Sequence, residues 1–266
     1  MIKLYFLGTD KRSKYLKEMY EEEIKKRKDI LITENLDEAD IIITPIPFSK
    51  DRVHITGESI DILEFLSNCK DKRVIGGALN SFKREFEECN VQYVDLMELD
   101  SIAYLNAIPT AEGAISKAME YTDYTIHGAN VLVLGFGRCG KILADKLKGL
   151  NANVFCEARN KKDLAHIKAL GYNVVELEKL RDVLSDMDII FSTIPTKILS
   201  KEELQLLKKD AVIIDLASAP GSVDYEACVQ LGVNAYLELG LPSKVAPKSA
   251  ASYLKEEIDK IIIRGI

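Results

Sequence analysis

The stretch from Val131 to Leu150, VLVLGFGRCGKILADKLKGL, limits the folds open to this chain more than any other segment. An apolar, β-branched run leads into a GxGxxG turn and then into an amphipathic helical pattern. In that context the first glycine permits a tight turn, the second lets backbone approach a pyrophosphate, and the third lets helix and strand pack closely. We therefore predict a dinucleotide site with its phosphates on the helix N-terminus, and favour it over a purely structural strand-to-helix turn. The residues expected to contact the cofactor there are Gly135, Gly137, Arg138, Cys139 and Gly140.

The five cysteines are scattered and include no CxxC pair and no histidine at a ligand spacing. This pattern favours reduced, mostly buried thiols, and we expect no metal site. Cys139 alone stands where a helix N-terminus would lower the pKa of a thiol. For Cys139 we favour the simpler role of a small residue that fits beside bound phosphates.

At 266 residues the chain is longer than one typical domain, so we expect two domains. Its net charge of −6, without any dense basic block, argues against nucleic acid or an anionic membrane surface as the main partner. No apolar run approaches the ~18 residues of a membrane span, and no amino-terminal segment resembles a signal peptide. The composition thus predicts a cytoplasmic protein, in which small anions can still bind locally.

Apolar strand patterns alternate with helical patterns along both halves of the chain. In the first half the predicted strands are 2–7, 40–44, 73–75 and 91–94. In the second half they are 131–135, 152–156, 173–175, 188–192, 211–215 and 233–237. Strands joined through helices by short connections run parallel and are covered on both faces. The pattern predicts an α/β protein of two doubly wound parallel-sheet domains, the second being a Rossmann dinucleotide-binding domain.

The predicted division gives a substrate-side α/β domain at residues 1–106 and the Rossmann domain at 107–247. Residues 95–106 have the character of a connection between the halves. Pro109 would then sit in the first turn of a linking helix, where proline costs no hydrogen bond. The final segment is amphipathic, and we expect residues 248–266 to return and pack on the first domain.

The identity of the dinucleotide should be encoded after the second strand of the Rossmann domain. An acid about twenty residues beyond the glycines binds the ribose 2′-hydroxyl of NAD, whereas a cation accommodates the 2′-phosphate of NADP. The chain offers both, with Glu157 close to that spacing and Arg159 two residues later. We favour NADP, because Arg159 suits a phosphate and Asn160 and Lys161 follow it as further donors. NAD and a merely solvated basic loop stay open as alternatives.

Three further strand ends should line the crevice, since ligands of open α/β sheets bind outside the carboxyl ends of the strands. Small residues and free backbone groups at two of them suit a nicotinamide ring and its carboxamide. The cofactor contacts expected there are Thr193, Ile194, Pro195, Ala217 and Ser218. Lys248 follows the sixth strand of this domain, where it could bind a substrate carboxylate or be a solvated lysine.

Histidine catalysis has little support in the sequence. His127 precedes the first Rossmann strand and so lies at the edge opposite the crevice, and we expect a structural role for it. His54 and His166 have no partner pattern. Two-domain 2-hydroxyacid dehydrogenases are similar in layout, but they bring an Arg, an acid and a His from strands after the cofactor site. This chain has no His beyond His166 and no Arg between Arg181 and Arg264, so lactate-type chemistry is disfavoured.

Several motifs, taken together and in order, are far more specific than the glycine turn. They are GTDKR near the start, LNAIPTAEGAI and YTIHGANVLVLGFGRCG in the middle, and FSTIPTKIL, DLASAPGSVDY and LGLPSKVAPKSA towards the end. With these motifs the chain resembles, over nearly its whole length, the A subunits of dipicolinate synthase from spore-forming bacteria. The resemblance implies oxidation of a dihydrodipicolinate-type intermediate from the lysine pathway to pyridine-2,6-dicarboxylate, in the mother-cell cytoplasm during sporulation. It also implies NADP or NAD as acceptor and, as partner, a flavoprotein B subunit.

The small dicarboxylate substrate implied by this resemblance needs hydrogen-bond donors for its two carboxylates. The expected ligands are Arg12, Ser116, Thr196, Ser218 and Lys248. Asp10 and Glu112 are the proton acceptors that the expected cleft offers, and with Lys248 they complete the expected catalytic set. Asp10 could instead cap the first helix, and Glu112 could be a first-turn acid that complements a helix dipole.

Two other functions stay open. The chain could bind NADP without transferring hydride, as a scaffold for the flavoprotein, because the usual carbonyl-polarising His and Arg are missing. It could also be another NADP-dependent dehydrogenase of a small carboxylic acid. In each case the base rates for enzymes lead us to expect a homodimer.

Overall fold

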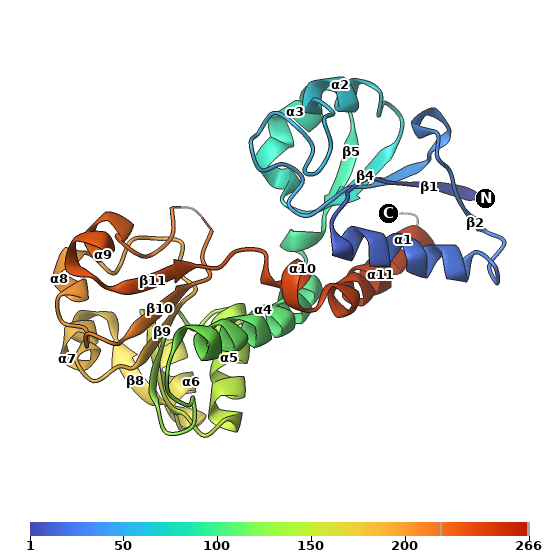
Figure 1. The fold of residues 1–266 in the computed structure, drawn as a ribbon. Coiled ribbons are helices and arrows are strands. Elements are labelled where there is room, and N and C mark those ends of the chain that lie inside the picture. The colour runs from blue at the N-terminus through green and yellow to red at the C-terminus, as the bar shows by residue number, and fades with distance from the viewer. Residues whose placement is uncertain (219, 265–266) are drawn as a thin grey trace. The chain divides into compact units, whose positions relative to one another are not determined.

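The computed structural model describes residues 1–218 and 220–264, and the chain divides into two compact units. Unit 1 contains Met1–Asn106 together with Ala246–Ile266, and unit 2 contains Ala107–Val245. In each unit helices cover a parallel sheet (Figure 1). Residues 265 and 266 of the predicted segment 248–266 lie outside the described part of the chain. No helix in the described range is both long enough and apolar enough to cross a membrane.

The sheet of unit 1 has, within the described residues, five parallel strands in the order β2-β1-β3-β4-β5. The strands are β1 Ile2–Phe6, β2 Ile30–Ile32, β3 Ile41–Ile43, β4 Arg73–Gly76 and β5 Gln92–Asp95. The sequence predicted four of them and missed β2, which is only three residues long and lies at the sheet edge. The strand order reverses between β1 and β3. The carboxyl ends of these two strands therefore form the switch point where ligands of such sheets bind.

Helices cover both faces of this sheet. One face carries α1 Lys11–Glu23 and α11 Pro247–Arg264, and the other carries α2 Ile62–Ser67 and α3 Lys83–Glu88. The last helix, α11, lies against α1, where the Tyr20 hydroxyl donates a hydrogen bond of 2.8 Å to Asp259 and Lys255 forms an ion pair with Glu23. The apolar side chains on the inner face of α11 belong to the core of unit 1.

The sheet of unit 2 has, in the part of the chain that is described, six parallel strands in the order β11-β10-β9-β6-β7-β8. The strands are β6 Asn130–Leu134, β7 Asn153–Ala158, β8 Asn173–Glu176, β9 Ile189–Ser192, β10 Val212–Asp215 and β11 Asn234–Leu237. This is the Rossmann strand order, with its switch point between β6 and β9. The prediction of two doubly wound parallel sheets, the second a Rossmann domain, is confirmed.

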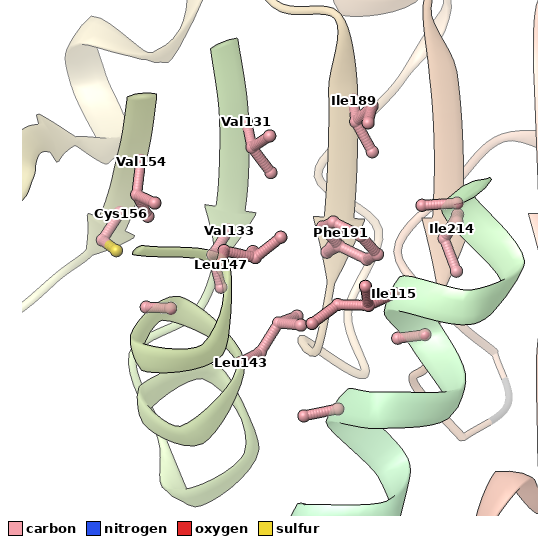
Figure 2. Packing of buried hydrophobic residues seen from close by; sticks show 14 of the residues in the cluster. Ile115, Val131, Val133, Leu143, Leu147, Val154, Cys156, Ile189, Phe191 and Ile214 are labelled. Carbon is pink, nitrogen blue, oxygen red and sulfur yellow. The ribbon is translucent and has the colours of Figure 1, made fainter. Parts of the chain in front are cut away.

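Two apolar layers hold the helices of unit 2 on the sheet. One face carries α4 Asp100–Tyr121, α5 Arg138–Gly149 and α6 Lys161–Ala169, and the other carries α7 Leu180–Leu184, α8 Lys201–Leu204 and α9 Tyr225–Leu231. Alternate residues of a strand point to opposite faces, so Val131 and Val133 belong to the first layer and the leucines that follow them to the second. Figure 2 shows the first layer, in which Leu143 of α5 and Ile115 of α4 reach the strands. The short helix α10 Leu241–Val245 follows β11.

Helix α4 differs from the prediction. It begins at Asp100, so Pro109 lies inside the helix and not in its first turn, and that part of the prediction is wrong. A proline inside a helix removes one backbone hydrogen bond. Packing on both sides of Pro109 explains why the helix continues, because Ile102 belongs to the core of unit 1 and Ala111 and Ala114 to the core of unit 2.

Candidate dinucleotide-binding site

The turn between β6 and α5 requires glycine at two positions. Gly135 has a φ of +91°, and a Cβ there would approach Thr193 Oγ1 to 2.7 Å. A Cβ on Gly140 would lie 2.0 Å from the carbonyl oxygen of Gly135, because the helix packs directly on the turn. Gly137 differs, since a Cβ there would meet no atom within 4 Å. The open space beside Gly137 lets a ligand approach the backbone.

Helix α5 begins without a capping side chain. Its N-cap residue is Gly137, which has no side chain to offer, whereas Asp10 caps α1 and Asn160 caps α6. The first turn of α5, which carries Arg138, therefore receives no side-chain acceptor from its N-cap. A pyrophosphate suits this position, because the helix dipole reinforces the N–H groups. The glycine turn and the uncapped helix together fit the phosphates of a dinucleotide.

Cys139 follows in the first turn of α5. Burial raises its pKa to about 11, so the thiol stays protonated at neutral pH. Nucleophilic and redox reactions of cysteine require the thiolate. Cys139 is therefore a small side chain near the predicted phosphate position and not a reactive thiol.

Glu157 lies at the end of β7, next to the glycine turn. It is 1% exposed, and its Oε2 accepts a hydrogen bond of 3.1 Å from the Gly135 N–H. Oε1 is also buried and has no partner among the described residues. Burial raises the pKa of Glu157, while the Gly135 N–H and the charge of Arg159 oppose that change. The acid that the sequence offered as a ribose ligand is therefore enclosed beneath the turn.

Arg159 is exposed directly after β7, in contrast to Glu157. It forms no hydrogen bond or ion pair with any described residue, and the same holds for the exposed Lys161. Asn160 is engaged, because its side chain caps α6 by accepting from the Asp163 N–H at 2.8 Å and donating to the Asp163 carboxylate at 2.7 Å. Two cations are thus available for a 2′-phosphate, while Asn160 holds the start of the next helix.

The end of β9 lies beside the glycine turn. Thr193 donates through both its N–H and its hydroxyl to the carbonyl of Leu134, each at 3.0 Å. Ile194 and Thr193 are the side chains that a Cβ on Gly135 would meet. The structure therefore brings the predicted contacts Thr193 and Ile194 together with the turn. The next residue, Pro195, is exposed.

The end of β10 is organised by a buried carboxylate that the sequence did not single out. Asp215 is fully buried and accepts hydrogen bonds from the Ala217 N–H at 3.0 Å and the Ser222 N–H at 3.1 Å. The Tyr225 hydroxyl donates to it at 3.2 Å, and burial raises the pKa of that tyrosine. These bonds fix the loop that buries Ala217 and exposes Ser218. A strand-ending Asp before a run of small residues was the available signal.

Asp10 and Arg12 follow β1 in unit 1. The Asp10 carboxylate caps α1, accepting hydrogen bonds from the Arg12 N–H at 2.9 Å and the Ser13 hydroxyl at 2.6 Å. Arg12 is only 5% exposed, and its guanidinium donates to the carbonyl of Ile46 at 2.5 Å. Burial lowers the pKa of Arg12, and Asp10 opposes that change. Asp10 therefore serves as a helix cap and Arg12 ties the β3–α2 loop to α1, while their roles towards substrate stay predictions.

Glu112 lies away from the glycine turn. It sits in the middle of α4, where its carboxylate forms an ion pair of 2.9 Å with Lys146 in the last turns of α5. The prediction of a first-turn acid facing the crevice is wrong, because α4 begins well before Pro109. The other expected substrate ligands are exposed and have no side-chain partner in the described part of the chain: Ser116, Thr196, Ser218 and Lys248.

Comparison with known proteins supports a dinucleotide-binding domain. Residues 103–231 match the family described as D-isomer specific 2-hydroxyacid dehydrogenase, NAD binding domain. The A subunit of dipicolinate synthase from Bacillus subtilis is 41% identical over 169 residues, which cover 64% of this chain and 57% of that protein. The chain thus spans less than two thirds of the length of this curated relative.

Two solved structures match the chain over nearly its whole length. The A subunit of dipicolinate synthase from Bacillus halodurans has a TM-score of 0.87 and 30% identity, covering 98% of this chain and 97% of that chain. This chain belongs to the family of dipicolinate synthase A subunits. The corresponding structure from Bacillus subtilis, with a TM-score of 0.86 and 30% identity, agrees over 99% of this chain and 96% of that one.

This member of the dipicolinate synthase family also has a pocket that its sequence did not indicate. The pocket has a volume of about 480 Å³ and lies in unit 1, beside the loops that follow β1 and β3. Its lining includes Lys50, Asp51, His54 and Thr56. Lys50 forms no ion pair with a described residue, and the Thr56 hydroxyl is buried without a partner among those residues. Donors without a partner in the described chain thus line a pocket of ligand size at the switch point of unit 1.

Asp51 and His54 form a pair in this lining, so the statement that His54 has no partner is wrong. His54 Nδ1 lies 2.9 Å from Asp51 Oδ2. The His54 N–H and imidazole, followed by the Val53 N–H, lower the pKa of Asp51. The signal was the D-x-x-H spacing in a turn, which helix and strand periodicity does not reveal. Among the described residues no group of three or more His, Cys, Asp or Glu side chains is placed to hold a metal ion.

Proposed function

We propose that this chain oxidises a dihydrodipicolinate-type intermediate to pyridine-2,6-dicarboxylate, as the A subunit of a dipicolinate synthase. The similarity to the Bacillus halodurans protein, which extends over 97% of that chain, carries the proposal. The glycine turn and the uncapped helix α5 supply the nicotinamide dinucleotide site that such an oxidation needs. NADP is the proposed acceptor, because Arg159 is exposed and has no partner among the described residues, while Glu157 is enclosed. NAD is the alternative.

The proposed reaction removes a hydride and a proton from the ring of the intermediate. A bound nicotinamide supplies the hydride acceptor, and formation of an aromatic ring makes the overall step strongly favourable. Positioning alone can contribute on the order of 7–11 kcal/mol to such a step, so a strong base is not required. The residues of this chain then hold the cofactor phosphates, bind the substrate carboxylates and receive the proton. Of the two predicted acids we retain Asp10 as the proton acceptor and not Glu112.

Two groups of donors are proposed for the substrate carboxylates. In unit 1 the exposed Lys50 and the paired His54 line the pocket of about 480 Å³, and they join the predicted Arg12. The predicted donors Ser116, Thr196, Ser218 and Lys248 are exposed and keep their proposed roles. Carboxylates bind most strongly to charged donors, so Lys50 and Lys248 are proposed to contribute most.

We further propose that the partner is a flavoprotein B subunit, that the location is the mother-cell cytoplasm and that the assembly is a homodimer. The first two rest on membership of a family whose solved members are named as one of the subunits of a synthase. The homodimer rests on base rates for soluble enzymes. Sedimentation of the purified chain, alone and mixed with the B subunit, measures both associations.

The test is an assay of the purified chain with freshly generated dihydrodipicolinate and NADP, with and without the B subunit. We expect NADPH and pyridine-2,6-dicarboxylate to form in equal amounts from this chain alone. Loss of the intermediate without any NADPH or NADH, whether or not the B subunit is present, would refute an oxidoreductase role.

A second candidate is a non-catalytic, NADP-binding scaffold for the flavoprotein. One observation favours it: no His follows His166, and no Arg lies between Arg181 and Arg264. The carbonyl-polarising pair of related dehydrogenases is therefore missing. Under this alternative the isolated chain forms no NADPH, and product appears only when the flavoprotein is present. A reaction with another small carboxylic acid, but none with dihydrodipicolinate, would instead indicate a dehydrogenase of different specificity.

A further inference from the structure

Glu157 is a buried carboxyl group with too few partners for an ionised acid. It is 1% exposed, and a single hydrogen bond, from the Gly135 N–H to Oε2 at 3.1 Å, reaches it within the described chain. Oε1 is buried and has no partner among the described residues. An ionised carboxylate has about four acceptor positions, and leaving them empty in a buried site is costly. The environment therefore suits the neutral acid.

The charged groups around Glu157 do not change this conclusion. Arg159, two residues later on the same strand end, is exposed, so solvent screens its charge. Glu178, which follows β8, is an exposed acid and opposes ionisation of Glu157. The turn after β6 contributes the N–H of Gly135. Burial is the largest influence and raises the pKa of Glu157.

We infer that Glu157 is a positioning and specificity residue, which holds the Gly135 turn as a neutral acid and disfavours NADP relative to NAD when it ionises. The inference rests on the proposed dinucleotide site. Its two parts follow from the same place in the fold. Glu157 holds the first glycine of the turn through Oε2, and it lies between that turn and Arg159, the proposed ligand of the 2′-phosphate.

Charge explains the effect on cofactor choice. A neutral Glu157 leaves Arg159 able to attract the 2′-phosphate of NADP. An ionised Glu157 adds a negative charge beside that phosphate in a poorly solvated place, and repels it. NAD carries a hydroxyl at this position and feels much less repulsion. Because Oε1 is buried from solvent, Glu157 is not the open ribose ligand that its spacing from the glycines suggested.

The test is the ratio of the dissociation constants of NADPH and NADH, measured by fluorescence titration of the full chain from about pH 5 to pH 9, since burial can raise the pKa of Glu to roughly 8–9. In the wild type we expect the ratio to rise by about five- to ten-fold with pH, which corresponds to the modest energy of a screened charge pair. In Glu157→Gln the ratio should change much less, because Gln keeps the hydrogen bond to Gly135 and cannot ionise. Comparison of the two removes the contribution of the 2′-phosphate itself, whose second pKa is about 6.

Glu178→Gln is the matched control, since it removes an exposed acid near Glu157 and should keep the wild-type profile. Equal profiles in the wild type and Glu157→Gln would overturn the inference while leaving the proposed function intact. A wild-type ratio that is flat over the whole pH range would do the same, even if Glu157→Gln failed to fold. If the wild type bound neither nucleotide, the inference and the proposed function would both fail.

Discussion

Arg159 is the side chain on which the proposed choice of NADP depends most directly. It is exposed, and no described residue holds it by a hydrogen bond or an ion pair. We expect Arg159→Ala to weaken NADPH binding by about ten-fold or more, since a charge-assisted contact to phosphate is lost. NADH binding should stay within about two-fold of the wild type, and Lys162→Ala should leave both unchanged. Unaltered NADPH affinity of Arg159→Ala in a fluorescence titration would remove Arg159 from the phosphate site.

Glu157 also makes stability depend on pH. Its pKa is raised in the folded chain, so the proton is bound more tightly there than in the unfolded chain. The stability from this group is complete below the unfolded pKa and is lost as pH rises through the folded pKa. Glu157→Gln lacks that loss, and its free energy of unfolding should gain on the wild type by about 1 kcal/mol or more at alkaline pH. Urea unfolding at several pH values measures this. A constant difference between the two proteins would contradict it.

At the level of elements, the contact between α5 and the glycine turn gives a sharp comparison within one helix. A Cβ at Gly140 would lie 2.0 Å from backbone, whereas a Cβ at Gly149 would meet nothing within 4 Å. We expect Gly140→Ala to cost about 1–3 kcal/mol of stability and to abolish NADPH binding. Gly149→Ala should keep binding and stabilise the chain by about 0.5–1 kcal/mol, because alanine favours helix. Normal NADPH affinity in Gly140→Ala would show that the turn does not form the site.

The β3–α2 loop of unit 1 provides a second element-level prediction. Lys50 and His54 line its pocket, and Asp51 orients the imidazole. We expect Lys50→Gln and His54→Gln each to weaken binding of pyridine-2,6-dicarboxylate by about ten-fold, as for the loss of a charged hydrogen bond. Lys70→Gln is the control, because Lys70 is exposed before β4, at the other edge of the sheet. Calorimetry that found wild-type affinity in both pocket variants would exclude this pocket as the carboxylate site.

The elements also show what sequence could and could not predict. Ten of the eleven strands in the described chain were predicted, because buried parallel strands are apolar runs bounded by turns. The edge strand β2 was missed because three residues give no periodic signal. Pro109 was misplaced because tertiary packing, which extends α4 on both sides of it, outweighs a local preference. Local rules therefore fail where burial in a distant core decides.

The candidate site shows the same division at its residues. The glycines were predictable, since their spacing reports the contacts that each must make. The burial of Glu157 was not, because its spacing is the same whether the side chain opens to a ribose or lies under the turn. The Asp51–His54 pair was not foreseen either, because turn geometry and not periodicity brings the two together. Function at this level depends on which polar groups are already engaged.

The whole molecule combines two doubly wound sheets, each with its own switch point. Unit 2 offers a dinucleotide turn and unit 1 a polar pocket. Family membership extends over both units, since the matched Bacillus halodurans chain is covered to 97%. The proposed oxidation gives each unit a task, one binding the acceptor and the other a carboxylate substrate. The central claim is that this chain itself transfers the hydride.

Isotope transfer tests that claim most directly. Dihydrodipicolinate would be prepared with deuterium at the ring carbon that loses hydride, and incubated with the purified chain and NADP without the flavoprotein. We predict that the deuterium appears in the reduced nicotinamide ring, in an amount equal to the pyridine-2,6-dicarboxylate formed, and that Gly140→Ala gives none. Dipicolinate formed without deuterium in the nicotinamide, or formed only when the flavoprotein is present, would contradict it.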